Sequence, residues 1–333
     1  MRIYLKPHRG PKKNLLKSLA TIAAIAGISA VLYSFLHGGL SAGSAGPIDV
    51  TFRPVPLNSE DPAQKTVGAL TYLAGFELSS SDQRFGGFSG LLAEADGRFV
   101  AVSDAGIWLT GDLQGAGPFA LIPMAENVRN ATKHLFDAEA LVRSDDGYLV
   151  TTERNHRLLS VAKPGAAPVP RPETALMQGW GLSSNGGIEA VTRLDDGTLL
   201  MFAERGQNIQ GLLPVWLVDT DRTVFNLKFK PPHNFAPTDA ATLPNGDILL
   251  LLRRFNSEAV AAKLLRVRAR DIKPGAVIRG EDLMTLAPPL SVDNMEALDT
   301  LLLEDGSQLV ILLSDDNFNW FQRTLLMLFR LDN

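Results

Sequence analysis

Residues 185–206 read NGGIEAVTRLDDGTLLMFAERG, two short apolar runs separated by an Asp-Gly turn, with a glutamate near each outer end. Apolar runs of this length around a turn that tolerates positive φ indicate a β-hairpin. Four further stretches repeat the pattern, at 88–106, 137–155, 238–255 and 294–317. The chain is therefore a series of related hairpins.

The turn glycines recur at intervals of 50, 50, 49 and 60 residues, at Gly97, Gly147, Gly197, Gly246 and Gly306. A repeat of about 50 residues built from strands is typical of a β-propeller blade. Residues 46–333 have room for nearly six such units, so we predict an all-β, six-bladed propeller, with five or seven blades as open alternatives. Residues 66–78 and 323–331 have strand-like compositions and are expected to share the sixth blade. No substantial helix is expected after residue 45.

A small residue follows the leading polar position of every hairpin. The first strand of a propeller blade lies nearest the axis, where neighbouring blades are crowded, so we interpret these residues as packing positions. They are Gly90, Ala140, Ala190, Ala240 and Ala297.

Polar side chains occupy both outer ends of each hairpin. Antiparallel pairing brings these two ends together, opposite the turn. In a propeller, all such pairs converge at one mouth of the central channel, and we predict a ring of about seven carboxylates there. The pairs are Ser89 with Asp104, Glu139 with Glu153, Glu189 with Glu204, Asp239 with Arg253, and Glu296 with Asp315.

Carboxylates gathered in this way repel one another unless a cation compensates them. Oxygen ligands favour Ca²⁺ first, with Mg²⁺ and Mn²⁺ next. The candidate metal ligands are Asp104, Glu139, Glu153, Glu189, Glu204, Asp239, Glu296 and Asp315. For any single acid, a solvated strand end is an equally good interpretation, and Asp239 with Arg253 is open to interpretation as a plain cross-strand ion pair.

Arginines beside the acids are candidates for binding an anionic group through bidentate contacts. They are Arg154, Arg205, Arg253 and Arg254. Other polar residues enter or leave the predicted mouth and are weaker candidates for a base or a ligand: His134, His156, His233, Asn155, Asn185, Asn294 and Asn317. The GFSG stretch at 87–90 lacks the G-x-S-x-G spacing of a hydrolase elbow, so Ser89 is interpreted as a repeat position.

Charge is distributed unevenly along the chain. Residues 1–45 carry six basic side chains and no acid, while the rest carries 26 basic and 36 acidic residues, a balance of −10. An acidic body argues against nucleic acid as a partner. Residues 19–36 lack charge and follow the basic stretch, so 1–45 is expected to be an apolar helix that acts as a signal peptide or N-terminal membrane anchor. Either would export 46–333 to the periplasm or beyond, and without cysteine the fold has no disulfides.

The hairpin series over residues 65–333 resembles the phytase-like propeller family of exported bacterial proteins, described by the phrase "esterase-like activity of phytase". The resemblance implies six blades and a divalent-metal site in the channel mouth. By position it implies metal-facing roles for Asp104, Glu139, Glu189, Glu296 and Asp315, and contact with an anionic substrate for Arg154 and Arg205. Ser89 and Arg253 depart from an all-acid pattern.

These features predict a metal-dependent hydrolase of phosphoric or carboxylic esters, with a small anionic ester or phosphate as substrate. The residues expected to carry the chemistry are Glu139, Glu189, Arg154 and Arg205. A carboxylate would take a proton from the attacking water while arginines stabilise developing negative charge. A metal-dependent lactonase of gluconolactonase type is an alternative enzyme, and a non-catalytic ligand-binding or scaffold propeller is the alternative from another class.

Overall fold

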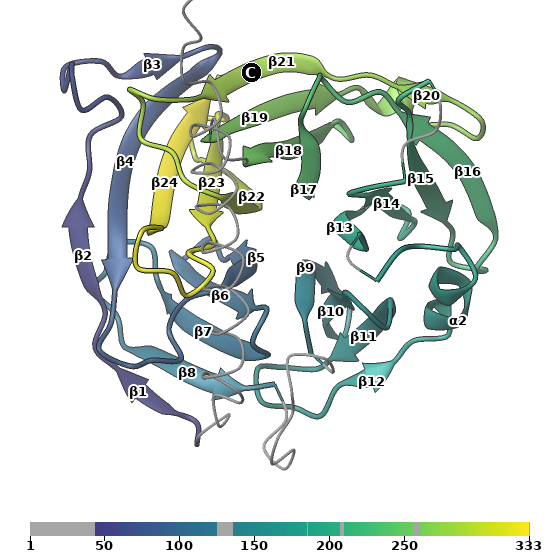
Figure 1. The fold of residues 1–333 in the computed structure, drawn as a ribbon, viewed down its shortest axis with the longest axis horizontal. Coiled ribbons are helices and arrows are strands. Elements are labelled where there is room, and N and C mark those ends of the chain that lie inside the picture. Colours follow the sequence, from purple (N-terminus) through teal and green to yellow (C-terminus); the bar gives the residue numbers. More distant parts are fainter. Residues whose placement is uncertain (1–43, 125–135, 185, 207–209, 256–259, 333) are drawn as a thin grey trace, which may run out of the picture. The chain divides into compact units, whose positions relative to one another are not determined.

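The computed structural model describes residues 44–124, 136–184, 186–206, 210–255 and 260–332. Within this part of the chain, five β-sheets surround a central channel (Figure 1). Their innermost strands contact one another in a closed circle, in the order β5, β9, β13, β17, β22 and back to β5; the bounds of each strand follow. This arrangement confirms the predicted β-propeller.

The first two sheets contain the hairpins predicted at 88–106 and 137–155. From the channel outward, the first sheet consists of β5 (Phe88–Ala93), β6 (Arg98–Ser103), β7 (Ile107–Asp112), β8 (Phe119–Pro123) and β1 (Gly46–Ile48). The second consists of β9 (Ala138–Ser144), β10 (Gly147–Thr152), β11 (Arg157–Val161) and β12 (Val169–Pro170), followed by the short helix α2 (Glu173–Gln178).

The next two sheets contain the hairpins predicted at 185–206 and 238–255. The third sheet consists of β13 (Ile188–Arg193), β14 (Leu199–Ala203), β15 (Leu213–Val218), β16 (Val224–Phe229) and β20 (Val277–Ile278), the last pair being parallel. The fourth consists of β17 (Ala236–Thr242), β18 (Ile248–Phe255), β19 (Val260–Val267) and β21 (Glu281–Leu286), with a 3₁₀ turn at Ala269–Asp271 before β20.

The fifth sheet closes the ring with strands from both ends of the propeller. It consists of β22 (Met295–Leu302), β23 (Gln308–Ser314), β24 (Thr324–Leu331), β4 (Leu70–Ser79) and β2 (Thr51–Pro54), with β3 (Thr66–Val67) also paired to β4. The N-terminal strand β4 lies between the C-terminal strand β24 and β2 (Figure 1). Both ends are thereby held by backbone hydrogen bonds of one blade.

The prediction of six blades is wrong, because the propeller has five. The two segments assigned to a sixth blade, 66–78 and 323–331, instead complete the blade that begins with the hairpin at 294–317. The residues that suggested another blade form additional outer strands, since β1 and β2 extend two sheets that already have their inner strands. Division of chain length by the repeat length therefore overestimated the number of blades.

The predicted N-terminal helix and the membrane or signal segment at 1–45 lie almost entirely outside the described residues. Among the residues that are described, no helix has the length and apolar character needed to cross a membrane. The longest α-helix described, α2, has six residues, which agrees with the absence of substantial helices expected after residue 45.

The hydrophobic core is divided among the contacts between sheets. Each of five buried clusters draws side chains from two neighbouring sheets, so every blade is stabilised by burial against the next. Trp108 belongs to the cluster between the first and second sheets. Trp180 and Trp216 stack at 4.2 Å between ring centroids beside the third sheet.

The small residues of the innermost strands are all buried, and Gly90 shows why they are small. A Cβ atom at Gly90 would lie 2.7 Å from Leu141 Cβ and 2.9 Å from the Leu141 backbone nitrogen of the neighbouring sheet. Both distances are below van der Waals contact, and one of the atoms is backbone that cannot rotate away. The inner strands therefore approach as closely as their backbones allow.

We expect Gly90→Ala to lower the free energy of unfolding by about 1–3 kcal/mol, because the added methyl overpacks the contact with Leu141. Urea denaturation followed by circular dichroism measures this change. Gly46→Ala is the matched control, since a Cβ there meets no atom within 4 Å. Equal stability of the two variants would contradict the close contact between blades.

Candidate functional site

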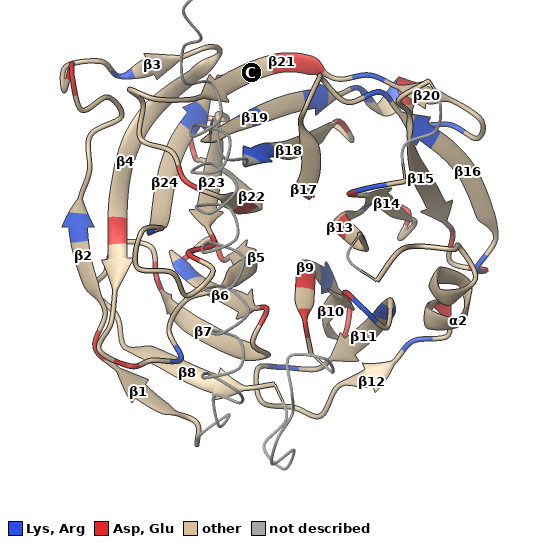
Figure 2. Cartoon of the chain, viewed as in Figure 1, with Lys and Arg blue, Asp and Glu red and all other residues tan. Residues whose placement is uncertain are grey.

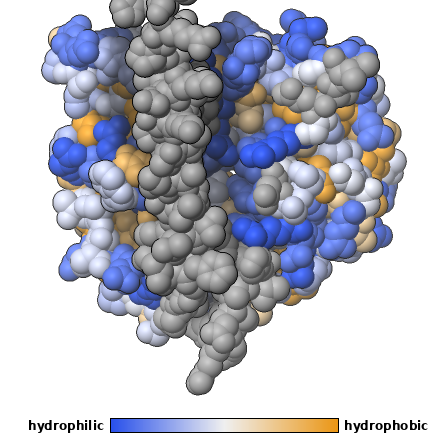
Figure 3. Space-filling view, in the orientation of Figure 1, coloured by the Kyte–Doolittle hydropathy of each residue, from blue (hydrophilic) through white to orange (hydrophobic). Residues whose placement is uncertain are grey.

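A cavity of about 230 Å³ lies where the open ends of the hairpins meet. Acidic and basic segments gather at the inner ends of strands around this opening (Figure 2). Hydrophilic residues border the visible part of the opening (Figure 3). The cavity is lined by Ser89, Asp104, Asp137, Glu139, Glu153, Arg154, Glu189, Glu204, Arg205, Arg253, Glu296, Asp315 and Asn317.

Seven of the eight acids proposed as metal ligands line this cavity, together with Arg154, Arg205 and Arg253. They come from hairpins spread over some 210 residues of sequence, from Asp104 to Asp315. The prediction that the hairpin ends converge at one mouth of the channel is therefore confirmed for these residues.

A β-bulge aims the leading side chain of each hairpin. In four sheets the bulged residue is the predicted leading residue, namely Ser89, Glu139, Glu189 and Glu296. A bulge inserts one unpaired residue and redirects its side chain. Three glutamates thus leave the regular alternation of their strands at equivalent positions and line the cavity.

The second acid of each pair follows the end of the next strand and is held by its backbone. The amide of Glu153 donates to the carbonyl of Asp137 at 2.8 Å, and the amide of Glu204 donates to that of Gly187 at 3.2 Å. Equivalent bonds join Asp104 to Gly87 at 2.8 Å and Asp315 to Asn294 at 2.9 Å. These bonds hold both members of a pair at the same end of the hairpin.

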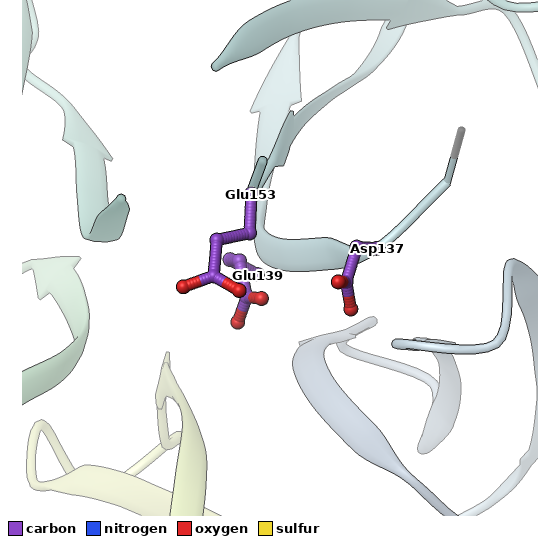
Figure 4. A group of neighbouring side chains, drawn as sticks. All are labelled: Asp137, Glu139 and Glu153. Atoms are coloured by element: carbon purple, nitrogen blue, oxygen red, sulfur yellow. The ribbon is translucent and has the colours of Figure 1, made fainter. Parts of the chain in front are cut away.

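Three carboxylates form the tightest acidic group among the described residues. One oxygen from each of Asp137, Glu139 and Glu153 lies within 4.8 Å of the other two. Their side chains face a common space beside β9 (Figure 4). Asp137 was not among the predicted ligands; it immediately precedes β9, and its carbonyl accepts the hydrogen bond from the Glu153 amide.

Arg253 is the most buried of the three arginines that line the cavity, with 23% of its side chain exposed. Its Nε lies 2.9 Å from Glu296 Oε1 and its Nη2 lies 3.2 Å from Glu204 Oε1. Asn294 donates to the same Glu296 oxygen at 2.8 Å. Arg253 therefore joins the third and fifth sheets by compensating one acid from each.

The other two arginines that line the cavity each pair with one acid. Arg154 donates from Nε to Asp137 at 2.6 Å, and Arg205 donates from Nε to Glu204 at 2.8 Å with 62% of its side chain exposed. Eight carboxylates and three guanidinium groups of the described residues line the cavity, a formal excess of five negative charges if all are ionised. Protons or bound cations must offset part of this excess.

The pKa values of five acids in the cavity are raised above their usual range. Burial, followed by the charges of neighbouring carboxylates, raises the pKa of Glu139 and of Glu189 well above the usual range. Burial raises the pKa of Glu153 to about 7 and that of Glu296 to about 7, although Arg253 opposes the shift of Glu296. Burial also raises the pKa of Asp315 well above its usual range.

The assignment of Asp239 to the ring of acids is corrected by the structure, because Asp239 does not line the cavity. The bulge of β17 falls at Thr238, so Thr238 occupies the position of the glutamates and Asp239 that of a small residue. Asp239 is buried and accepts hydrogen bonds from the amides of Ala240 and Leu298, both at 2.8 Å. It links the fourth and fifth sheets, and burial raises its pKa well above the usual range.

Hydroxyl groups at the bulge position also connect neighbouring blades. Ser89 donates to the carbonyl of Ala138, and Thr238 donates to that of Met295 at 3.2 Å. The acceptor in each case immediately precedes a cavity glutamate. This contact accounts for Ser89 as a structural residue, as its position in the repeat predicts.

The other predicted polar residues are dispersed. Asn317 lines the cavity and Asn294 bonds to Glu296, whereas His233 is exposed and Asn155 is not among the lining residues. Arg254 lies over the ring of Phe235, with Cζ 5.2 Å from the centroid. His156 is buried beside the acids but does not line the cavity. His134 and Asn185 lie outside the described residues.

Comparison with known proteins identifies one matching family. The phytase-like family, described as "Esterase-like activity of phytase", matches residues 83–318. None of the curated proteins matches the sequence. Among solved structures, the chain is similar to an endo-arabinase from Bacteroides thetaiotaomicron VPI-5482, with 10% identity, a TM-score of 0.48 and coverage of 79% of this chain and 96% of that chain. It is also similar to the PQQ-bound aldose sugar dehydrogenase of Streptomyces coelicolor, with 9% identity, a TM-score of 0.44 and coverage of 86% and 99%.

We expect the melting temperature of the metal-free protein to fall as pH rises from about 5 to 7.5. Between the ordinary glutamate pKa and the folded value of about 7 for Glu153 and Glu296, the folded chain binds more protons than the unfolded chain, so stability decreases with pH. Differential scanning fluorimetry in EDTA measures this slope. Glu139→Gln and Glu189→Gln should each flatten it, and a melting temperature that rises over this range would contradict the charge imbalance.

We expect Asp239→Ala to destabilise the protein by about 2–3 kcal/mol, because it leaves two buried amides without an acceptor. Since Asp239 does not line the cavity, the variant should keep whatever metal affinity the wild type has. Chemical denaturation and calcium titration together check both statements. A variant of normal stability that loses metal affinity would indicate that Asp239 contributes to metal binding.

Proposed function

The chain belongs to the phytase-like family, and we propose that it is a divalent-metal-dependent hydrolase of phosphoric or carboxylic esters that acts at the cavity in the channel mouth. One observation carries this proposal. In the part of the chain that the structure describes, eight carboxylates and three arginines line a single cavity, and three of the carboxylates have oxygens within 4.8 Å of one another. A protein that retains such repulsion has a use for a cation at that position.

The residues fit a hard divalent cation. Asp137, Glu139 and Glu153 offer only oxygen donors, which suit Ca²⁺ and, after it, Mg²⁺ or Mn²⁺. In this proposal these three hold the ion, with Glu189 as a further ligand or base on the same cavity wall. A bound ion of this kind would lower the pKa of a coordinated water and polarise the ester.

The side chains of the cavity supply the remaining functions. Arg205 is largely exposed at the mouth, and its guanidinium group is suited to bind the anionic part of a substrate in a bidentate manner. Arg154, held by Asp137, is suited to stabilise negative charge that develops on the ester. Glu189 lines the same cavity, and in this proposal its carboxylate accepts a proton from the attacking water.

We also propose that the propeller acts outside the cytoplasm. The support is the sequence of residues 1–45, in which a basic stretch precedes an uncharged apolar run. A small anionic ester or phosphate is the proposed partner, and the acidic character of residues 46–333 argues against nucleic acid. Cell fractionation with an antibody against the propeller tests the location.

We expect Ca²⁺ to raise the melting temperature of EDTA-treated protein and Glu139→Gln or Glu153→Gln to weaken calcium binding at least tenfold. Each variant should also raise the melting temperature of the metal-free protein, because it removes a repelling charge. Isothermal titration calorimetry and thermal denaturation measure the two effects. Glu304→Gln is the control, since this exposed acid lies in the turn at the opposite end of a hairpin.

Turnover separates the candidate activities. Metal-dependent hydrolysis of p-nitrophenyl phosphate or p-nitrophenyl acetate, abolished by Glu189→Gln, is the expected result. Hydrolysis of a sugar lactone alone would instead favour the lactonase. Absence of turnover on all three substrates, in a protein that Glu189→Gln merely stabilises, would leave a ligand-binding or scaffold propeller.

A further inference from the structure

The loop between β23 and β24 carries two adjacent exposed aromatic residues. The side chain of Trp320 is 95% exposed and that of Phe321 is 61% exposed, with their rings edge to face at 5.8 Å. Among the described residues, no other pair of neighbouring aromatic side chains is exposed to this extent. The same loop begins with Asp315 and contains Asn317, both of which line the cavity. Trp320 follows Asn317 by three residues, so its Cα lies within about 11 Å of the Cα of a residue that lines the cavity.

The loop is anchored to the first sheet. Asp316 accepts hydrogen bonds from the amides of Gly87 and Phe318 and from Thr324 Oγ1, each at 3.0 Å. The ring of Phe318 packs so closely against Gly87 that any side chain at position 87 would clash with it. These contacts fix the middle of the loop, and Trp320 and Phe321 follow this fixed part directly.

Among the described residues, no apolar side chain lines the cavity. Its walls are built only from Ser, Asp, Glu, Arg and Asn side chains, which can bind the charged part of an ester but offer no surface for an apolar part. Exposed aromatic rings attract flat or ring-shaped groups by stacking and by burial of apolar area. The aromatic pair supplies at the rim the kind of surface that the cavity lacks.

We propose that Trp320 and Phe321 form a stacking platform that binds the ring of the alcohol portion of the substrate ester, while the anionic portion enters the acidic cavity. This inference rests on the proposed function. It makes the loop a determinant of specificity: esters whose alcohol carries a ring bind more tightly than esters of a small alkyl alcohol. The two aromatic residues contribute to binding and take no part in proton transfer.

Binding of two non-hydrolysable probes tests the platform without requiring turnover. Phenylphosphonate and methylphosphonate are titrated by calorimetry into the calcium-loaded full chain, its Trp320→Ala variant and the double variant Trp320→Ala, Phe321→Ala. We expect the wild type to bind phenylphosphonate about tenfold more tightly, and the double variant to bind both probes equally. Phe225→Ala, which removes an exposed aromatic residue of β16, is the control and should keep the preference.

A wild type without preference for phenylphosphonate, or a double variant that retains it, would overturn the inference. So would loss of anionic vesicle binding or of self-association in the double variant with the probe preference intact, since the pair would then serve a membrane or a second copy. Steady-state kinetics separates this inference from the proposed function. For p-nitrophenyl phosphate the double variant should raise KM with kcat nearly unchanged, and for ethyl phosphate it should alter neither.

The two ideas fail in different ways. Ester hydrolysis without any effect of the double variant on KM would support the hydrolase function and contradict the stacking platform. The opposite outcome is a preference for phenylphosphonate that the double variant loses, in a protein that hydrolyses no ester. This would support the stacking platform and contradict the hydrolase function. Equal melting temperatures of variant and wild type confirm that neither result comes from misfolding.

Discussion

Mutual repulsion among carboxylates in the channel mouth is the constraint on which the rest of this structure depends. Burial raises the cost of each charge, and the neighbouring acids raise it further, so the group is stable only with protons, arginines or bound cations among its members. Arg253 compensates Glu204 and Glu296 on one side. Asp137, Glu139 and Glu153 form the other side, where Arg154 donates a hydrogen bond to Asp137. The cavity therefore has a part neutralised from within and a part suited to an added cation.

The scaffold tolerates this repulsion because the acids belong to blades that are held together elsewhere. Apolar clusters fill every contact between sheets, and small residues such as Gly90 allow the inner strands to approach closely. Additional polar links cross between blades near the axis. Asp239 bonds to the Leu298 amide, and Ser89 and Thr238 bond to carbonyls of the next inner strand. Stability thus comes from the interfaces and chemistry from the strand ends, as is usual when function is carried by residues at the ends of a rigid scaffold.

Each inner strand has a bulge, but the residue at the bulge differs among the five repeats. At equivalent positions of the five inner strands stand three glutamates and two hydroxyl residues. The glutamates line the cavity, whereas the hydroxyls are short enough to bond to the neighbouring strand. The identity of this one residue therefore decides whether the bulge position adds a carboxylate to the cavity or a hydrogen bond between inner strands. The loop that carries Asp315 and Asn317, which line the cavity, also carries the exposed Trp320.

The sequence by itself determined the hairpins, their convergence and most of the acidic residues, because turn glycines and strand alternation are local properties that recur with the period of the fold. Only the tertiary structure decided three matters. The number of blades depends on which sheet the terminal strands join, and strand composition carries no information about distant partners. Asp239 was placed one position away from its true equivalence, because the bulge at Thr238 shifts the register without any signal in the apolar pattern. Asp137 joins the acidic group because the chain entering β9 brings it beside Glu153, a proximity that depends on three-dimensional backbone geometry.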